Sequence, residues 1–412
     1  MENLVDQFRE QVSIILLVQE NLLNIDNEEN RVEKIIEFVD KNPQFTQDQI
    51  LFLSFIQSIS SSMTSRPLFE KQYVEIIQHY LPRIPKKIIF SFLSKSNMSL
   101  ALFIDRKVID INDIEKNCNS INHNSLIYFK DYIKNAKSSS ILTELITKSD
   151  ESKEKENQIA KFIREDDVKN FQIVVNEYNE FKYNTKVPWS IFECMLFLNE
   201  KEMPTYTEYA CFFGAIKIFK YMVLNGVLAT NDDEYLSKLG EFAVIGGNYD
   251  IIHILEDHGL KFTEKSLLNS IKFHRNEISI YLNETIGIQQ EFIDILMSVE
   301  SNNLSYFIDN FVVVNNQKKF TEIEFQKLWF VAAENGRFEI IKFLSNKEFE
   351  FDRNIKNENG QNILHIAVSN GFLNIVEFLF KQKIIDLNNR DEFVFFFKFM
   401  EFKLIYFLSY YT

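Results

Sequence analysis

Residues 359–379 read NGQNILHIAVSNGFLNIVEFL, and this stretch decides the fold. A small residue, Ala367, stands four places before Gly371, and an apolar run that ends at Leu379 follows. The alanine allows a helix to approach its neighbour closely, and the glycine can end that helix in the left-handed conformation. The apolar run suits the packed face of a second helix. The stretch therefore predicts a helix, a tight turn and an antiparallel helix.

The same block occurs six times in the second half of the chain. The blocks span 210–214, 243–247, 270–274, 296–300, 332–336 and 367–371, and their first residues are 33, 27, 26, 36 and 35 places apart. These spacings bracket a helix-turn-helix repeat of about 33 residues. Four blocks keep both the alanine and the cap glycine, and we predict a structural role for these positions: Ala210, Gly214, Ala243, Gly247, Ala332, Gly336, Ala367 and Gly371. The pattern predicts an all-α solenoid with a helical N-terminal region, a class that presents surface more readily than it encloses a catalytic site.

The composition agrees with a helical array in the cytoplasm. The 412 residues include 41 Phe but only 10 Gly and 6 Pro, so the turns do not depend on Pro-Gly chemistry. The net charge of −14 comes from interspersed acidic and basic residues, which argues against nucleic acid as a partner. The three cysteines lack metal-ligand spacing and suggest reduced thiols.

The sequence divides into five expected segments. They are a helical N-terminal region (1–136, with degenerate repeats from about residue 82), a charged and Ser-rich connection (137–158), divergent repeats (159–285), clear repeats (286–391) and a Phe/Tyr-rich tail (392–412). In the first segment we expect Ser58–Ser65 to break the helical pattern and Pro67 to lie near a new helix start. Ser99–Phe103 can be laid over Ile375–Leu379, and Val108–Asp113 over Ile384–Asn389. In the third segment we expect Asp166 to take the place that Gly214 has later.

The stretch 359–379 resembles the ankyrin repeat, whose pattern contains Gly-x-Thr-Pro-Leu-His-x-Ala. Asn362-Ile363 replaces Thr-Pro, which we expect to loosen the turn at the helix start. In this position the imidazole of His365 is expected to bond backbone groups of the neighbouring turn. Residues 159–285 further resemble a divergent family of ankyrin-type proteins, abundant in some parasitic protists, that contains an uncharacterised domain. The residues that carry this second resemblance are Phe162–Arg164, Asp167, Val168, Phe171, Ser190–Glu193 and Tyr209–Ile216.

Nothing in the sequence predicts catalysis, a metal site or a cofactor. His253 and His258 are five residues apart and fall on different faces of a helix, whereas zinc needs convergent ligands. The adjacent carboxylates at Asp166-Asp167 and Asp232–Glu234 suit helix starts, where the helix dipole favours them. An enzymatic domain within residues 1–150 would require a pocket with converging polar groups, and the sequence shows no pattern that predicts one.

The resemblance implies a non-enzymatic scaffold or adaptor that binds unidentified proteins. We expect the concave face, formed by the first helices and the hairpin fingers, to hold the partner. The candidate contact residues are polar fingertip positions: Asp352, Arg353, Asn357, Asn388, Arg390 and Asp391. The oligomeric state stays open.

The tail after Asp391 departs from the repeat pattern, because it is rich in Phe and Tyr where a capping repeat has a polar outer face. Three interpretations remain open: a final packed helix, a truncated or misassembled reading frame, and contact with a membrane. Charged residues interrupt the run, so a spanning helix is not expected. The alternative function is a membrane-associated adaptor that uses this tail.

Overall fold

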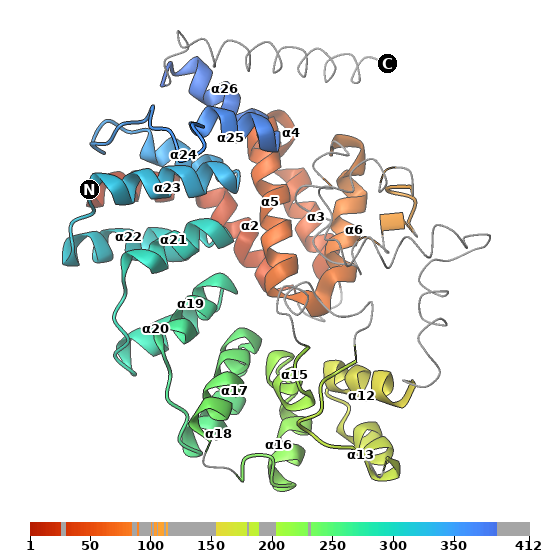
Figure 1. Cartoon of the computed structure of the whole chain (residues 1–412). Coiled ribbons are helices and arrows are strands. Elements are labelled where there is room, and N and C mark those ends of the chain that lie inside the picture. Colours follow the sequence, from red (N-terminus) through yellow and green to blue (C-terminus); the bar gives the residue numbers. More distant parts are fainter. Residues whose placement is uncertain are drawn as a thin grey trace. The chain divides into compact units, whose positions relative to one another are not determined.

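The computed structural model of the chain describes residues 1–25, 30–84, 89, 100, 103–104, 106–110, 113, 154–178, 181–188, 203–229 and 232–384. These residues form α-helices and two short 3-10 helices joined by turns (Figure 1). Within the described ranges the one β-type contact is an isolated antiparallel bridge between Lys186 and Thr205. The predicted all-α class is therefore confirmed for this part of the chain.

The described residues divide into two compact units. The C-terminal unit consists of Met1–Leu17, Asp48–Phe55 and the residues from Gln290 onward, and the central unit consists of Val18–Gln47 and Ile56–Gln289. The N-terminal helices are shared between these two units and do not form a third. Within the repeats the division lies at 289/290, close to the expected segment boundary at 285/286.

The repeats of the central unit are pairs of helices, each with a first and a second helix. The pairs are α12 (Glu154–Glu165) with α13 (Val168–Glu177), α15 (Tyr206–Phe212) with α16 (Ile216–Leu224), α17 (Asp233–Gly246) with α18 (Tyr249–Asp257), and α19 (Glu264–Lys272) with α20 (Asn276–Glu284). The first helices α15, α17 and α19 pack against one another in chain order. A Cβ atom at Gly246 would lie 2.2 Å from the carbonyl oxygen of Cys211, so the contact between α15 and α17 requires glycine there.

The C-terminal unit contains three further pairs. They are α21 (Phe292–Ser301) with α22 (Leu304–Gln317), α23 (Glu322–Glu334) with α24 (Phe338–Leu344), and α25 (Ile363–Asn370) with α26 (Leu373–Lys381). Phenylalanine fills much of the space between them. The ring of Phe343 lies 5.4 Å from that of Phe311 and 5.0 Å from that of Phe349, centroid to centroid. These edge-on and tilted contacts explain in part why the chain uses so many phenylalanines.

A left-handed residue ends the first helix of every described pair. Its φ angle lies between +48° and +77°, at Asp166, Gly214, Gly247, His274, Asn302, Gly336 and Gly371. In six of these turns the next amide N–H donates to the carbonyl five residues earlier, over 2.7 to 2.9 Å, from residues 167, 215, 275, 303, 337 and 372. The expected position of Asp166 is thus confirmed, and the shared bond fixes the register of the repeats.

The predicted register of the block at 296 is wrong by two residues. Ser298, with 1% of its surface exposed, is the buried small residue of this repeat instead of Leu296. Asn302, with φ of +65°, is the left-handed residue instead of Glu300. No glycine marks this turn, and asparagine tolerates the left-handed conformation better than glutamate does.

The prediction that Ser58–Ser65 breaks the helical pattern is also wrong. Helix α5 (Gln49–Ser65) continues through the whole stretch. Two of the hydroxyl groups donate within the helix: Ser61 Oγ to the carbonyl of Ser58 and Ser65 Oγ to that of Ser61, each over 3.0 Å. This bonding back to the preceding turn allows serines to lie buried in a helix. Pro67 then opens a 3-10 helix, η1 (Pro67–Phe69), before α6 (Glu70–Tyr80), as predicted.

The remaining N-terminal helices are α1 (Glu2–Gln11), α2 (Ser13–Leu23), α3 (Arg31–Lys41), α4 (Pro43–Gln47) and η2 (Leu81–Arg83). In the C-terminal unit α1 packs against the repeats. Phe8 lies 4.7 Å from the ring of Phe343, and Arg9 Nη2 lies 2.8 Å from Asp309 Oδ1 on α22. In the central unit α3 packs against α6.

The local geometry around residue 107 agrees with the expected overlay on the last repeat. Lys107 and Lys383 are both left-handed, with φ of +58° and +51°. The amide of Val108 donates to the carbonyl of Phe103 over 2.8 Å, and the equivalent bond joins Ile384 to Leu379 over 3.2 Å. The two segments therefore end a helix in the same way, which supports a degenerate repeat in the N-terminal region.

Candidate interaction surface

The predicted fingertip residue Arg353 is engaged within its own finger. Its Nη2 group donates to the carbonyls of Asn346, over 2.7 Å, and Phe349, over 2.9 Å. The guanidinium carbon also lies 4.7 Å from the ring centre of Phe351. Burial lowers the pKa of this guanidinium. Arg353 thus closes the finger that follows α24.

Asp352 and Asn357 lie on the same finger. The Asp352 residue is exposed, and its carboxylate accepts a bond from the amide of Asn354 over 2.9 Å. The side-chain oxygen of Asn357 accepts from the amides of Asn359, over 3.0 Å, and Gln361, over 2.9 Å, and so shapes the turn that leads to α25. The other three candidates, Asn388, Arg390 and Asp391, lie outside the described residues, as does the tail 392–412.

The start of α25 keeps its capping bonds despite the missing Thr-Pro. Asn362 Oδ1 accepts from the amide of His365 over 3.1 Å, and Nδ1 of His365 lies 2.6 Å from the same oxygen. Both residues are buried. Asparagine therefore replaces threonine as the cap, and the expected loosening of the turn is absent. The imidazole is engaged at the start of its own helix.

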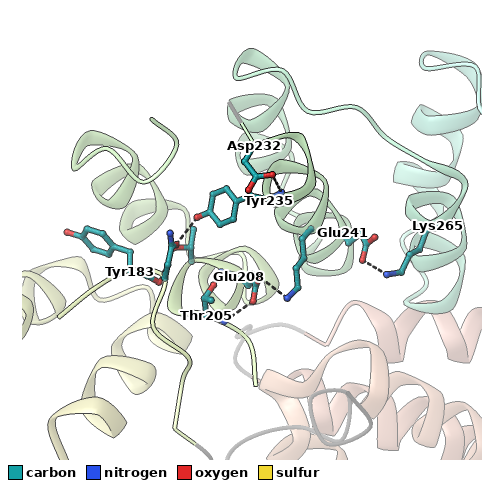
Figure 2. A network of polar contacts seen from close by, with 10 residues as sticks. Tyr183, Thr205, Glu208, Asp232, Tyr235, Glu241 and Lys265 are labelled. Carbon is teal, nitrogen blue, oxygen red and sulfur yellow. Dashed lines mark hydrogen bonds and ion pairs between the residues drawn. The ribbon is translucent and has the colours of Figure 1, made fainter. Parts of the chain in front are cut away.

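A ladder of ion pairs joins the first helices of the central unit, and the sequence analysis did not identify it. Glu208 on α15 pairs with Lys238 on α17 over 3.1 Å, and Glu241 on α17 pairs with Lys265 on α19 over 2.7 Å (Figure 2). Each glutamate stands two places before the small residue of its repeat, and each lysine five places before it. We call these four residues the Glu–Lys ladder.

The lysine end of each pair faces solvent. The side chains of Lys238 and Lys265 are 51% and 64% exposed, whereas those of Glu208 and Glu241 are 4% and 20% exposed. Glu208 also closes a capping box, because its Oε2 accepts from the amide of Thr205 over 2.7 Å. The glutamates therefore hold the lysines in a row along the first helices.

The aromatic and amide side chains beside the ladder extend the polar network. Tyr235, near the start of α17, donates its hydroxyl to Asn184 Oδ1 over 2.9 Å (Figure 2). Asp232 caps α17 by accepting from the amides of Glu234 and Tyr235. Burial is the main cause that raises the pKa of Tyr235 to about 12, so its hydroxyl stays protonated at neutral pH. This part of the surface offers hydrogen-bond donors and cations.

A signal for the ladder exists in the sequence. When the blocks are aligned on Ala210, Ala243 and Ala367, the position two places earlier holds Glu208, Glu241 and His365 respectively. A glutamate at the histidine position of two successive repeats is a departure from the ankyrin pattern. Such a glutamate, followed by a lysine at the threonine position of the next repeat, is the sequence signal that indicates each ion pair.

The described residues contain few side chains suited to nucleophilic catalysis or metal binding. The thiol of Cys211 is buried, and burial raises its pKa well above the ordinary value, which disfavours the nucleophilic thiolate. His253 contacts Glu256 Oε2 over 2.9 Å, while His258 contacts the carbonyl of Ile254 over 2.7 Å. In the part of the chain that the structure describes, no three His, Cys, Asp or Glu side chains gather as a metal site would require. No helix in these ranges has the length and apolarity needed to cross a bilayer.

Two family models match parts of the chain. A family model described as ankyrin repeats (3 copies) matches residues 295–391, and one described as a domain of unknown function (DUF3447) matches residues 231–312. A search of curated protein sequences returned no match. Among solved structures, the human ASB11 ankyrin repeat domain is similar at 12% identity, covering 51% of this chain and 90% of that chain, with a TM-score of 0.32.

Together the two family matches cover five of the helix pairs, from α17 to α26. The pairs α12–α13 and α15–α16, which share the left-handed turn, lie outside them. The expected resemblance to an uncharacterised domain is confirmed, but at residues 231–312, so it overlaps only the second part of the expected range 159–285. The residues between 162 and 216 that carried the expectation lie outside the match. The chain therefore contains ankyrin repeats at residues 295–391, preceded and partly overlapped by a stretch that matches this domain of unknown function.

Proposed function

We propose that the chain is a non-enzymatic scaffold that binds another protein through the first helices and fingers of its repeats. Ankyrin repeats generally serve as protein-interaction scaffolds. The Glu–Lys ladder is the structural feature of this chain that supports a protein-binding function. Two glutamates whose side chains are largely buried hold two lysines in position. The charged ends of these lysines remain in solvent.

The ladder contributes little to folding through its exposed ends, because ion pairs with a solvated partner stabilise a protein by about 0 to 1 kcal/mol. A row of cations held at a fixed spacing is better suited to recognising an acidic partner surface, since complementary charge raises the association rate and fixes the register. The partner that fits is therefore a protein with an acidic patch.

The test compares charge reversal on the two helix layers. Full-length chain carrying K238E and K265E is compared with wild-type chain in affinity capture from native extract, with captured proteins quantified by mass spectrometry. The matched control is K217E with K220E on the second helix α16, because these lysines are also exposed, at 70% and 57%, and also form ion pairs.

We expect the ladder variant to lose proteins that both the wild type and the control retain. The loss should be greater at low salt, where exposed charges are less screened. Equal recovery by all three chains would refute a role of the ladder. Equal loss in both variants would instead point to non-specific attraction to basic surface.

A further inference from the structure

A cavity in the central unit gathers three arginines. It has a volume of about 460 Å³ and is lined by Arg31, Arg66 and Arg275, together with apolar residues that include Phe69 and Phe213. None of the described residues that line it is acidic. This is unexpected in a chain whose net charge is −14.

Two of these arginines bind backbone carbonyls of the repeats. Arg275 donates from Nε to the carbonyl of Ile245 over 2.9 Å and from Nη2 to that of Gly246 over 2.7 Å. Arg66 donates from Nη1 to the carbonyl of Phe273 over 3.0 Å. These bonds bring Arg66, which follows α5, next to the turn that contains Arg275. The guanidinium groups are thus fixed in position by the fold.

No carboxylate among the described residues pairs with these two cations. Neither Arg66 nor Arg275 forms an ion pair with any described residue, and Nη1 of Arg275 donates to none of them. Burial lowers the pKa of Arg275 well below its usual range, and the nearby charge of Arg66 lowers it further. Partly buried charges are normally paired, since leaving them without a counter-ion is costly.

A comparison within the chain shows what a purely structural arginine looks like. Arg337 occupies the position of Arg275 two repeats later, directly after the left-handed residue, and also donates to carbonyls of the preceding repeat, those of Val299 and Glu300. The carboxylates of Glu300 and Glu339 act on it electrostatically. Arg337 therefore has acidic neighbours, whereas Arg275 has none among the residues that the structure describes.

We propose that this cavity binds a small molecule bearing phosphate groups. A guanidinium presents parallel N–H donors that match the oxygens of phosphate, and binding there supplies the missing negative charge. The volume lies in the range of small-molecule sites, about 300 to 1,000 Å³. The apolar wall, with Phe69 and Phe213, suits an organic portion of the ligand. This site is independent of the proposed protein-binding surface.

The probe is inorganic pyrophosphate, titrated calorimetrically into the full chain. We expect saturable binding and a rise in the melting temperature. The variants R31Q and R66Q should each weaken binding about tenfold, the loss of one charge-assisted contact of roughly 1.5 kcal/mol. R275Q should do the same, provided that its circular dichroism spectrum shows a folded chain.

R337Q is the matched control, because it removes an arginine from the same repeat position elsewhere. It should lower the melting temperature but leave the affinity for pyrophosphate unchanged. Absence of saturable binding to the wild type would overturn the proposal. Binding that R31Q and R66Q retain in full would overturn it as well, since the phosphate would then be held at another place.

Discussion

The carboxylate of Glu208 serves two repeats at once: Oε2 accepts from the amide of Thr205 at the start of α15, and Oε1 pairs with Lys238 on α17 over 3.1 Å. The first bond is local and the second crosses the stack. Because Glu208 is buried and Lys238 is exposed, the two partners contribute unequally to stability.

Replacing Glu208 by Gln should destabilise the chain by about 1 to 2 kcal/mol, since it weakens the cap and leaves buried donors poorly satisfied. Replacing Lys238 by Met should cost less than about 1 kcal/mol, because the exposed pair contributes little. Urea unfolding followed by circular dichroism measures both. Equal losses for the two variants would contradict the assignment of the carboxylate to the cap.

At two left-handed positions, we expect that removing a glycine destabilises the chain and that introducing one stabilises it. Gly371 has φ of +75°, so G371V should destabilise the chain by about 1 to 2 kcal/mol or more. Lys383 has φ of +51° and an exposed side chain, so K383G should stabilise it by up to about 1 kcal/mol. Thermal unfolding of the full chain tests the pair. A loss of stability in K383G would show that the turn does not hold this conformation.

A buried carboxyl predicts a pH dependence. Glu339 accepts a hydrogen bond from Ser54 Oγ, and burial raises the pKa of its carboxyl. A raised folded pKa means that the folded chain keeps this proton to higher pH than the unfolded chain. The associated stability is full below the ordinary glutamate pKa and is lost as pH rises through the raised value.

The variant E339Q should therefore show a shallower fall of melting temperature than the wild type as the pH rises above the ordinary glutamate pKa. The exposed Glu348, replaced by Gln, serves as the control and should leave the slope unchanged. If E339Q and the wild type lose stability in parallel over this range, the carboxyl does not carry the effect.

The serine-rich helix α5 contains one hydroxyl that finds no partner among the described residues, Ser62 Oγ. S62A should stabilise the chain by about 1 kcal/mol, because it removes a buried polar group that makes no hydrogen bond. S61A should have a smaller effect or cost stability, since Ser61 donates to the carbonyl of Ser58. Urea midpoints of the two variants decide between these outcomes.

Some features could be predicted from sequence because their causes are local. Gly214, Gly336 and Gly371 end helices in a conformation that other residues resist, so they mark the repeat directly. Pro67 likewise marks a helix start. The block at 296 has no glycine, and its turn is marked only by Asn302, a weaker signal because asparagine tolerates the left-handed conformation less readily than glycine does.

The serines of α5 could not be interpreted correctly in the same way. Their propensity favours a break, but burial and bonding to the preceding turn override it. Local propensity determines the secondary structure of a segment only where tertiary contacts do not outweigh it. The same limit applies to Arg353, which looked like a free fingertip and instead donates to the carbonyls of its own finger.

The sequence by itself determined the helical class, the repeat of about 33 residues and the positions of the cap glycines, since periodicity and positive φ leave a local trace. Only the tertiary structure decided which side chains meet. Glu208 and Lys238 are 30 residues apart, and Arg66 and its carbonyl partner Phe273 are 207 residues apart. Such pairs form because the packing of helices brings distant segments within hydrogen-bond distance. A local sequence pattern does not show which distant residues will meet.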